Sequence, residues 1–209
     1  MKEQIVSKLD EIADALKYRT INYNMVDTGL YGYAMGTILF FCYYRKFKCC
    51  HEYDNLLEIL LDKVFEKIGN GIYFPTYCTG IAGTLYGMQY IQEKKLIVID
   101  VTEAQDCYSD YIRKRMLAEI NRGNIDFLHG ATGIGIYLLK CALSKGTKNT
   151  IVTYIDYLEK SGIYLDNTIK WVSNDISEAN HIVNISLSHG MSSIAIFLAR
   201  VFKTEIIPQ

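Results

Sequence analysis

The chain has 209 residues, of which 50% are hydrophobic and 22% are charged, and its formal net charge is −1. This composition is typical of a globular protein with a sizeable core and argues against a disordered chain. Because the charge is close to neutral and no basic run occurs, the sequence also argues against a nucleic-acid partner. We expect one folded domain over residues 1–209.

The N-terminal segment and the cysteines both indicate a cytoplasmic protein. Residues 1–10 are charged throughout and lack the apolar centre of a secretory signal. The six cysteines form no C-x-x-C pair, and Cys42 and Cys141 lie in apolar segments, as expected of free thiols in a reducing compartment. The longest uncharged run, residues 28–44, contains several glycines, so we interpret it as a buried helix rather than a membrane span.

Amphipathic and apolar helices are predicted to alternate along the chain. Residues 3–18 carry one apolar stripe at helical spacing. The next segment, Tyr33–Tyr44, is apolar on every side and predicts a helix buried on all sides. This order repeats three times. One-sided helices are expected at about residues 53–68, 102–121 and 147–160, buried helices at 84–91, after Gly133 and at 194–202, and a small β-hairpin within 163–172.

A glycine-rich turn precedes each predicted buried helix, at intervals of about 50 to 60 residues, which is typical of a helical repeat protein. The motif has two interpretations. Glycine at such a turn lets another segment approach closely; alternatively, the free N–H groups at the start of the helix face a ligand. Each amphipathic helix and the apolar helix after it make one pair, with the amphipathic helix outside and the apolar helix inside. Stacked outer–inner pairs of this kind form either a solenoid or an (α/α) toroid. The four turns are Gly29-Leu-Tyr-Gly32, Gly80-Ile-Ala-Gly83, Gly130-Ala-Thr-Gly133 and Gly190-Met-Ser-Ser193.

Two stretches of the sequence resemble the lanthionine synthetase C-like (LanC-like) family. These are Asp126-Phe-Leu-His-Gly-Ala-Thr-Gly133 and Leu187-Ser-His-Gly-Met191, which are similar to the third and fourth repeats of the family. The resemblance covers the whole chain but only the N-terminal four of the family's seven helix pairs. It implies an all-α fold in which about four outer–inner pairs form a partial, open (α/α)7 barrel. The domain at 1–209 is then C-terminally incomplete relative to the family.

The resemblance also implies an activity and two site residues. Bacterial members of the family add a cysteine thiol to a dehydrated serine or threonine of a precursor peptide, which a dehydratase has prepared, and a zinc ion activates the thiol. Asp126, four positions before Gly130, and His189, directly before Gly190, match the acid–base residues of the family. Histidine suits this role because it titrates near neutral pH. His129 also precedes a glycine but matches the family less closely.

The zinc ligands of the family have no counterpart in this sequence. They belong to a Cys-x-Gly and a Cys-His-Gly motif in the sixth and seventh helix pairs. Tyr77-Cys-Thr-Gly80 has the Cys-x-Gly form but lies in the second repeat, so we interpret Cys78 as an interior thiol. Because a catalytic zinc site needs about three protein ligands, we expect no metal-ligand set here and no zinc bound by this chain alone.

Three functional hypotheses remain open at this point, and whether the chain is an enzyme is left undecided. The first is a cyclase that is truncated or split between chains. The second is a non-catalytic scaffold that binds a peptide or a modification enzyme. The third and weakest is a glycosidase-like toroid enzyme, which needs two carboxylates across a cleft, whereas only Asp27 accompanies Asp126 at an inner-helix entrance. Residues 194–202 hold a single charge, which predicts self-association or docking on a missing half.

Overall fold

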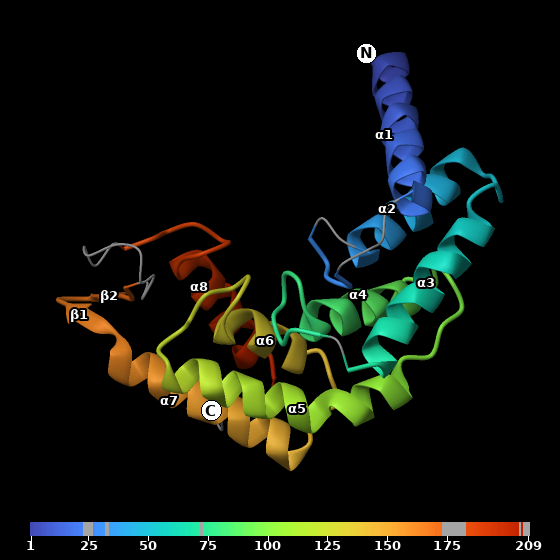
Figure 1. Cartoon of the computed structure of the whole chain (residues 1–209). Helices are drawn as coiled ribbons and strands as arrows, with labels where there is room; N and C mark the ends of the chain where they lie inside the picture. The colour runs from blue at the N-terminus through green and yellow to red at the C-terminus, as the bar shows by residue number, and fades with distance from the viewer. Residues whose placement is uncertain (23–26, 32–33, 72, 173–182, 205, 207–209) are drawn as a thin grey trace. The chain divides into compact units, whose positions relative to one another are not determined.

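The computed structural model describes residues 1–22, 27–31, 34–71, 73–172, 183–204 and 206. Within these ranges it contains eight α-helices and one short β-hairpin (Figure 1). The chain divides into two compact units. One comprises Met1–Phe74 with Thr79–Val101, and the other comprises Pro75–Cys78 with Thr102–Gln209.

The first unit is organised around its second helix, α2, which packs against the other three helices of the unit. The apolar side chains between them form the core, with Met35, Ile38 and Leu85 fully buried. The hydroxyl of Thr84 donates a hydrogen bond to the main-chain oxygen of Thr28 (3.1 Å), which fastens the entrance of α2 to α4. The described helices are α1 (Lys2–Asn22), α2 (Ala34–Lys48), α3 (Asp54–Gly69) and α4 (Ile81–Glu93).

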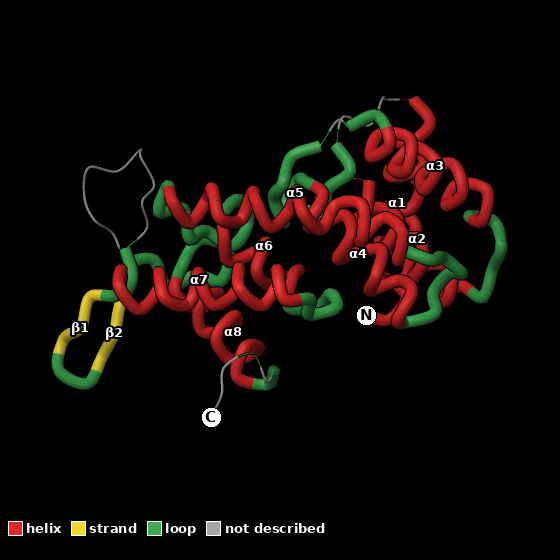
Figure 2. Tube along the Cα trace, turned by 90° about the horizontal axis from the view of Figure 1, so that it is seen from below, coloured by secondary structure: helices red, strands yellow, loops and turns green. Residues whose placement is uncertain are grey.

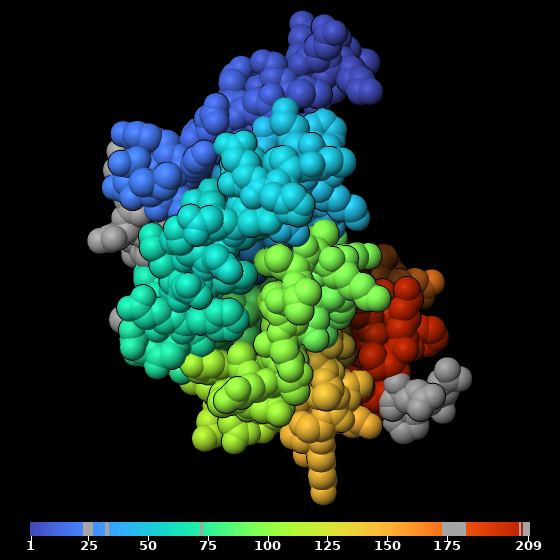
Figure 3. Space-filling view, turned by 90° about the vertical axis from the view of Figure 1, so that its right-hand side faces the viewer, coloured from blue at the N-terminus to red at the C-terminus, as the bar shows by residue number. Residues whose placement is uncertain are grey.

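Helix α1 is amphipathic, as predicted, but it is largely open to solvent (Figure 3). Of its apolar stripe only Ala13 is fully buried, and Ile5 is 56% exposed. Asp10 ties α1 to α2 by accepting hydrogen bonds from Tyr44 and from the ammonium group of Lys48. The hydrogen bond from Lys48, followed by that from Tyr44, lowers the pKa of the Asp10 carboxyl.

The second unit places two long helices, α5 and α7, side by side and packs the short helix α6 against both of them and against α8. Strands β1 and β2 pair antiparallel, with Ile163 opposite Lys170, and project beyond α7 (Figure 2). The predicted hairpin is therefore confirmed. The elements are α5 (Thr102–Asn121), α6 (Ala131–Leu138), α7 (Lys145–Ser161), β1 (Ile163–Leu165), β2 (Thr168–Lys170) and α8 (Met191–Phe202).

The inner helices differ in how completely they are buried. All eight residues of α6 are buried, as the apolar sequence predicts. The expectation that Tyr33–Tyr44 is buried on every side is wrong for Tyr43, which is 44% exposed. The predicted buried helix at 194–202 is only partly buried in α8, where Ile196 is 41% exposed and Phe202 is 79% exposed. Within the described part of the chain α6 is the main helix neighbour of α8, so only the face carrying Ile194 and Phe197 is covered.

Gly36, which lies outside the glycine pair predicted from sequence, permits close packing at the start of α2. A Cβ atom on Gly133, the third residue of α6, would lie 1.9 Å from the main-chain oxygen of Phe127. At the third residue of α2, a Cβ on Gly36 would lie 2.5 Å from the main-chain oxygen of Leu30. Gly36 therefore corresponds to Gly133, whereas Gly32 lies outside the described residues. Glycine spacing in the sequence did not single out Gly36. Only the approaching carbonyl of Leu30 shows that this position excludes a side chain.

Candidate functional site

Two loops of the second unit carry the residues that the sequence singled out. One precedes α6 and contains Asn124-Ile-Asp-Phe-Leu-His-Gly130; the other precedes α8 and contains Asn184-Ile-Ser-Leu-Ser-His-Gly190. The two segments share Asn-Ile at the start and His-Gly at the end. Because α6 packs against α8, their preceding loops lie next to each other.

The loop before α6 is closed by its own polar groups. The side-chain oxygen of Asn124 accepts a hydrogen bond from the main-chain N–H of Asp126 (3.2 Å), and Oδ1 of Asp126 accepts one from the N–H of His129 (2.7 Å). The main-chain oxygen of Asn124 accepts the N–H of Ala131 (2.9 Å) at the start of the helix. Short polar side chains commonly stabilise turns in this way.

The loop before α8 repeats these hydrogen bonds. The side-chain oxygen of Asn184 accepts the N–H of Ser186 (2.8 Å), and the hydroxyl oxygen of Ser186 accepts the N–H of His189 (3.2 Å). The main-chain oxygen of Asn184 accepts the N–H of Met191 (2.8 Å). The duplicated sequence thus gives two loops of the same design, and each presents a histidine directly before the helix.

Asp126 and His189 meet between the two loops. Oδ2 of Asp126 lies 2.6 Å from Nδ1 of His189. The carboxylate is largely buried, with 16% of its side chain exposed, whereas the imidazole is 48% exposed. A carboxylate that holds one ring nitrogen orients the ring and leaves the other nitrogen for a reactant. The structure therefore brings together the two residues that the family resemblance indicated.

His129 stands beside this pair, although sequence reasoning gave it little weight. Its ring stacks on the ring of His189, with centroids 6.4 Å apart and an interplanar angle of 20°. The side chain is exposed. The repeated Asn-Ile…His-Gly pattern was the sequence signal that could have identified it, because equivalent positions in adjacent repeats lie side by side.

Cys78 lies near the same carboxylate. Its main-chain N–H donates to the oxygen of Leu128 (2.9 Å), and the neighbouring ring of Tyr77 packs on that of Phe127 with centroids 4.8 Å apart. Burial raises the pKa of the Cys78 thiol, and the negative charge of Asp126 raises it further. The buried, protonated thiol matches the sequence interpretation of an interior cysteine.

The loop that carries Asp126 is anchored to α5 through a second acidic residue. The side-chain amide of Asn124 donates to Oε2 of Glu119 (2.9 Å), which is only 7% exposed. Arg122 forms an ion pair with Oε1 of the same carboxylate (3.3 Å). Sequence reasoning did not identify this network, because nothing in the spacing indicates that Glu119 turns inward.

The family model described as "Lanthionine synthetase C-like protein" matches residues 24–205. The chain belongs to this family. Among solved structures, nisin cyclase matches with a TM-score of 0.68 and 16% sequence identity, over 98% of this chain and 55% of that chain. The LanC-like chain thus spans about half the length of nisin cyclase. The likeness confirms the predicted all-α fold of (α/α) toroid repeats. No curated protein matches the sequence.

The donor groups at this LanC-like site do not fit a zinc centre. Among the described residues, no group of three or more His, Cys, Asp or Glu side chains has an arrangement that could hold a metal ion. Both oxygens of Asp126 already accept hydrogen bonds or an ion-pair contact, from the N–H of His129 and the ring of His189. Catalytic zinc requires about three protein ligands, and the described residues around Asp126 do not supply such a set.

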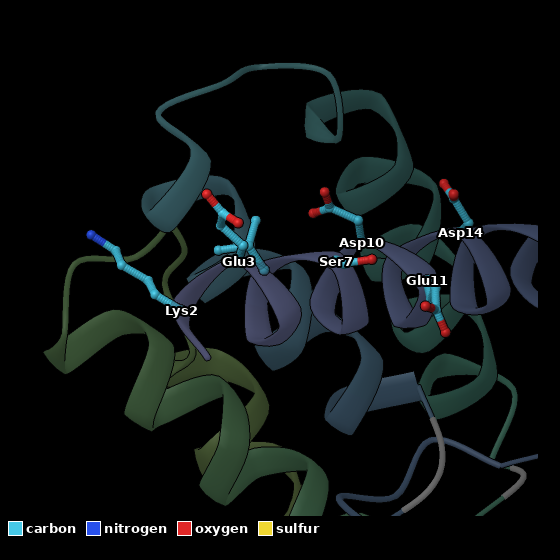
Figure 4. Close-up of a pocket in the computed structure, with 7 residues that line it drawn as sticks. Lys2, Glu3, Ser7, Asp10, Glu11 and Asp14 are labelled. Atoms are coloured by element: carbon cyan, nitrogen blue, oxygen red, sulfur yellow. The ribbon is translucent and has the colours of Figure 1, made fainter.

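A hollow lies on α1 of the LanC-like chain, in the first unit (Figure 4). It has a volume of about 670 Å³, and all of its lining residues come from this one helix. Acidic side chains dominate it, and Asp10 is already paired with Lys48. An exposed helix face of this kind is a solvated surface.

In the described part of the chain, no helix combines the length and apolar character needed to cross a membrane.

Proposed function

We propose that this LanC-like chain catalyses the addition of a cysteine thiol to a dehydrated serine or threonine residue in a peptide, which forms a thioether. Family membership supports the reaction class. The proposal rests on one observation, the 2.6 Å contact between Asp126 and His189, which lie in the loops that precede α6 and α8. The implied partners are a precursor peptide and a dehydratase that makes its unsaturated residue.

The chemistry requires an acid–base group at the α-carbon of the acceptor. Sulfur forms a bond to the β-carbon, the electrons of the double bond move to the α-carbon, and this carbon then takes a proton. His189, held through Nδ1 by Asp126, has Nε2 available to deliver that proton. The carboxylate stabilises the positive charge that the ring carries before the transfer.

A direct test uses a synthetic peptide that contains one dehydroalanine and one cysteine. Ring closure is followed as loss of the free thiol, by alkylation and mass spectrometry. His189→Gln should slow the enzymatic reaction about 100-fold, in the range typical for removing an acid–base group. His51→Gln is the matched control, because His51 is also exposed and also holds an aspartate, Asp54, through Nδ1 (2.8 Å).

The alternatives give different results in this assay. If the wild-type chain binds the peptide but leaves its thiol free, the cyclase proposal fails and the scaffold hypothesis takes its place. If His189→Gln and His51→Gln reduce the rate equally, the Asp126–His189 pair is not the catalytic group.

A further inference from the structure

Two imidazoles, rather than one, stand at the Asp126 carboxylate. The rings of His129 and His189 are nearly parallel and their centroids are 6.4 Å apart. Their links to Asp126 differ. His189 uses a ring nitrogen, whereas His129 uses only its main-chain N–H. Within the described residues, the ring nitrogens of His129 carry no hydrogen bond and are available to a reactant.

The addition proposed above moves two protons at two different atoms. One leaves the sulfur, and another arrives at the α-carbon. Both atoms are bonded to the same β-carbon, and each proton carrier must come within about 3 Å of the atom it serves. Two rings whose centroids are 6.4 Å apart are therefore spaced to serve the sulfur and the α-carbon together, one ring to each atom.

We propose that His129 is a second catalytic residue, the base that takes the proton of the attacking thiol; this inference rests on the proposed function. Neutral His129 accepts the S–H proton, the sulfur electron pair forms the bond to the β-carbon, and protonated His189 supplies the proton to the α-carbon. No proton is gained or lost overall. Both rings are exposed, so exchange with water restores their starting protonation states.

The surroundings of the two rings determine which is acid and which is base. The Asp126 carboxylate lies 2.6 Å from Nδ1 of His189 and accepts a hydrogen bond from that nitrogen, which leaves Nε2 of the same ring to serve as the acid. The ring of His129 has no carboxylate partner within the described residues and is left as the base. Two described ionisable groups contact His129: His189 stacks on its ring, and Asp126 accepts its main-chain N–H. The negative charge of Asp126 also acts on the thiol of Cys78, on the adjoining loop.

The test compares His129→Gln with His189→Gln in the dehydroalanine–cysteine peptide assay between about pH 6.5 and 9. Glutamine keeps the main-chain N–H that Asp126 accepts. His129→Gln should be about 10- to 100-fold slower than wild type at about pH 6.5. Near pH 9 the gap should close, because a free thiol with a pKa of about 8.5 is then mostly thiolate and needs no base.

A second readout separates the two histidines. His189→Gln should remain slow at high pH and give a mixture of configurations at the α-carbon, whereas His129→Gln should retain one configuration. His129→Asn must show the same pH pattern as His129→Gln, and His51→Gln must match wild type. A rate for His129→Gln that equals wild type, or a deficit that is the same at every pH, overturns the base role while the proposed function stands. An inactive wild-type chain overturns both.

Discussion

Oδ2 of Asp126 lies 2.6 Å from Nδ1 of His189, although the two residues are 63 positions apart in the chain. The contact exists because α6 packs against α8, and each helix is entered through a loop of the same hydrogen-bonded design. The carboxylate is mostly buried while the imidazole remains half exposed. This asymmetry fixes the ring from the protein side and leaves its other edge open to solvent.

Replacing Asp126 by asparagine should remove the charge that supports His189 without removing the side-chain volume. We expect Asp126→Asn to slow thioether formation by about 100-fold or more, as loss of an orienting carboxylate does in other acid–base pairs. The rate is measured with the dehydroalanine–cysteine peptide. Asp54→Asn, which removes the carboxylate beside the exposed His51, is the control. Equal rates for the two variants would contradict the assigned role.

Asn124 and Asn184 occupy equivalent turns, but only Asn124 is bonded to a buried carboxylate within the described residues. Asn124→Ala removes the amide that donates to Glu119, which is 7% exposed, and leaves this acceptor poorly satisfied. We expect Asn124→Ala to lower the free energy of unfolding by about 1–3 kcal/mol, more than Asn184→Ala does. Urea denaturation of both variants measures the difference. A larger loss for Asn184→Ala would show that the Glu119 network contributes little.

Gly133 is a position where any side chain collides with the main chain. An added Cβ would lie 1.9 Å from the oxygen of Phe127 and 2.7 Å from Cβ of Tyr77, so Gly133→Ala should destabilise the fold by about 3 kcal/mol or more. Gly69→Ala is the control, because no atom lies within 4 Å of its added Cβ; we expect a change between neutral and about 1 kcal/mol stabilising. Urea unfolding compares them, and a stable Gly133→Ala would argue against the close approach.

The thiol of Cys78 should react slowly with iodoacetamide until the pH is well above neutral. The thiolate is the reactive form, and burial, followed by the charge of Asp126, disfavours it and raises its pKa. The alkylation midpoint should therefore lie above the ordinary value of about 8.5, and Asp126→Asn should move it to lower pH without restoring that value, because burial remains. Mass spectrometry of labelled peptides measures both profiles, with exposed Cys107 as reference.

The same pKa shift has a consequence for stability. A group whose pKa is raised by folding stabilises the folded state fully below its unfolded pKa, and this contribution is lost as the pH rises through the folded pKa. Cys78 therefore stabilises the fold at neutral pH and ceases to do so under alkaline conditions.

In the alkylation experiment, an unshifted midpoint in Asp126→Asn would mean that burial alone controls the pKa of the Cys78 thiol.

The local sequence pattern was sufficient to predict much of the secondary structure of this protein. The apolar stripe of α5, the fully apolar segment of α6 and the turn at Asp166-Asn167 within the hairpin each specify their own secondary structure. These features depend on residues a few positions apart, whose periodicity decides which face is buried. Asp126 and His189 were likewise identified singly, from their positions before Gly130 and Gly190.

The arrangement of the site depends on contacts between distant segments. That His189 reaches the carboxylate of Asp126, that His129 stacks beside it, and that Gly36 matches Gly133 all follow from which helices pack together. The sequence by itself determined the helices, their repeat and the candidate residues, because each is encoded by neighbours in the chain. Only the packing of α6 on α8 decided the geometry of the site, because it places two loops of the same design side by side.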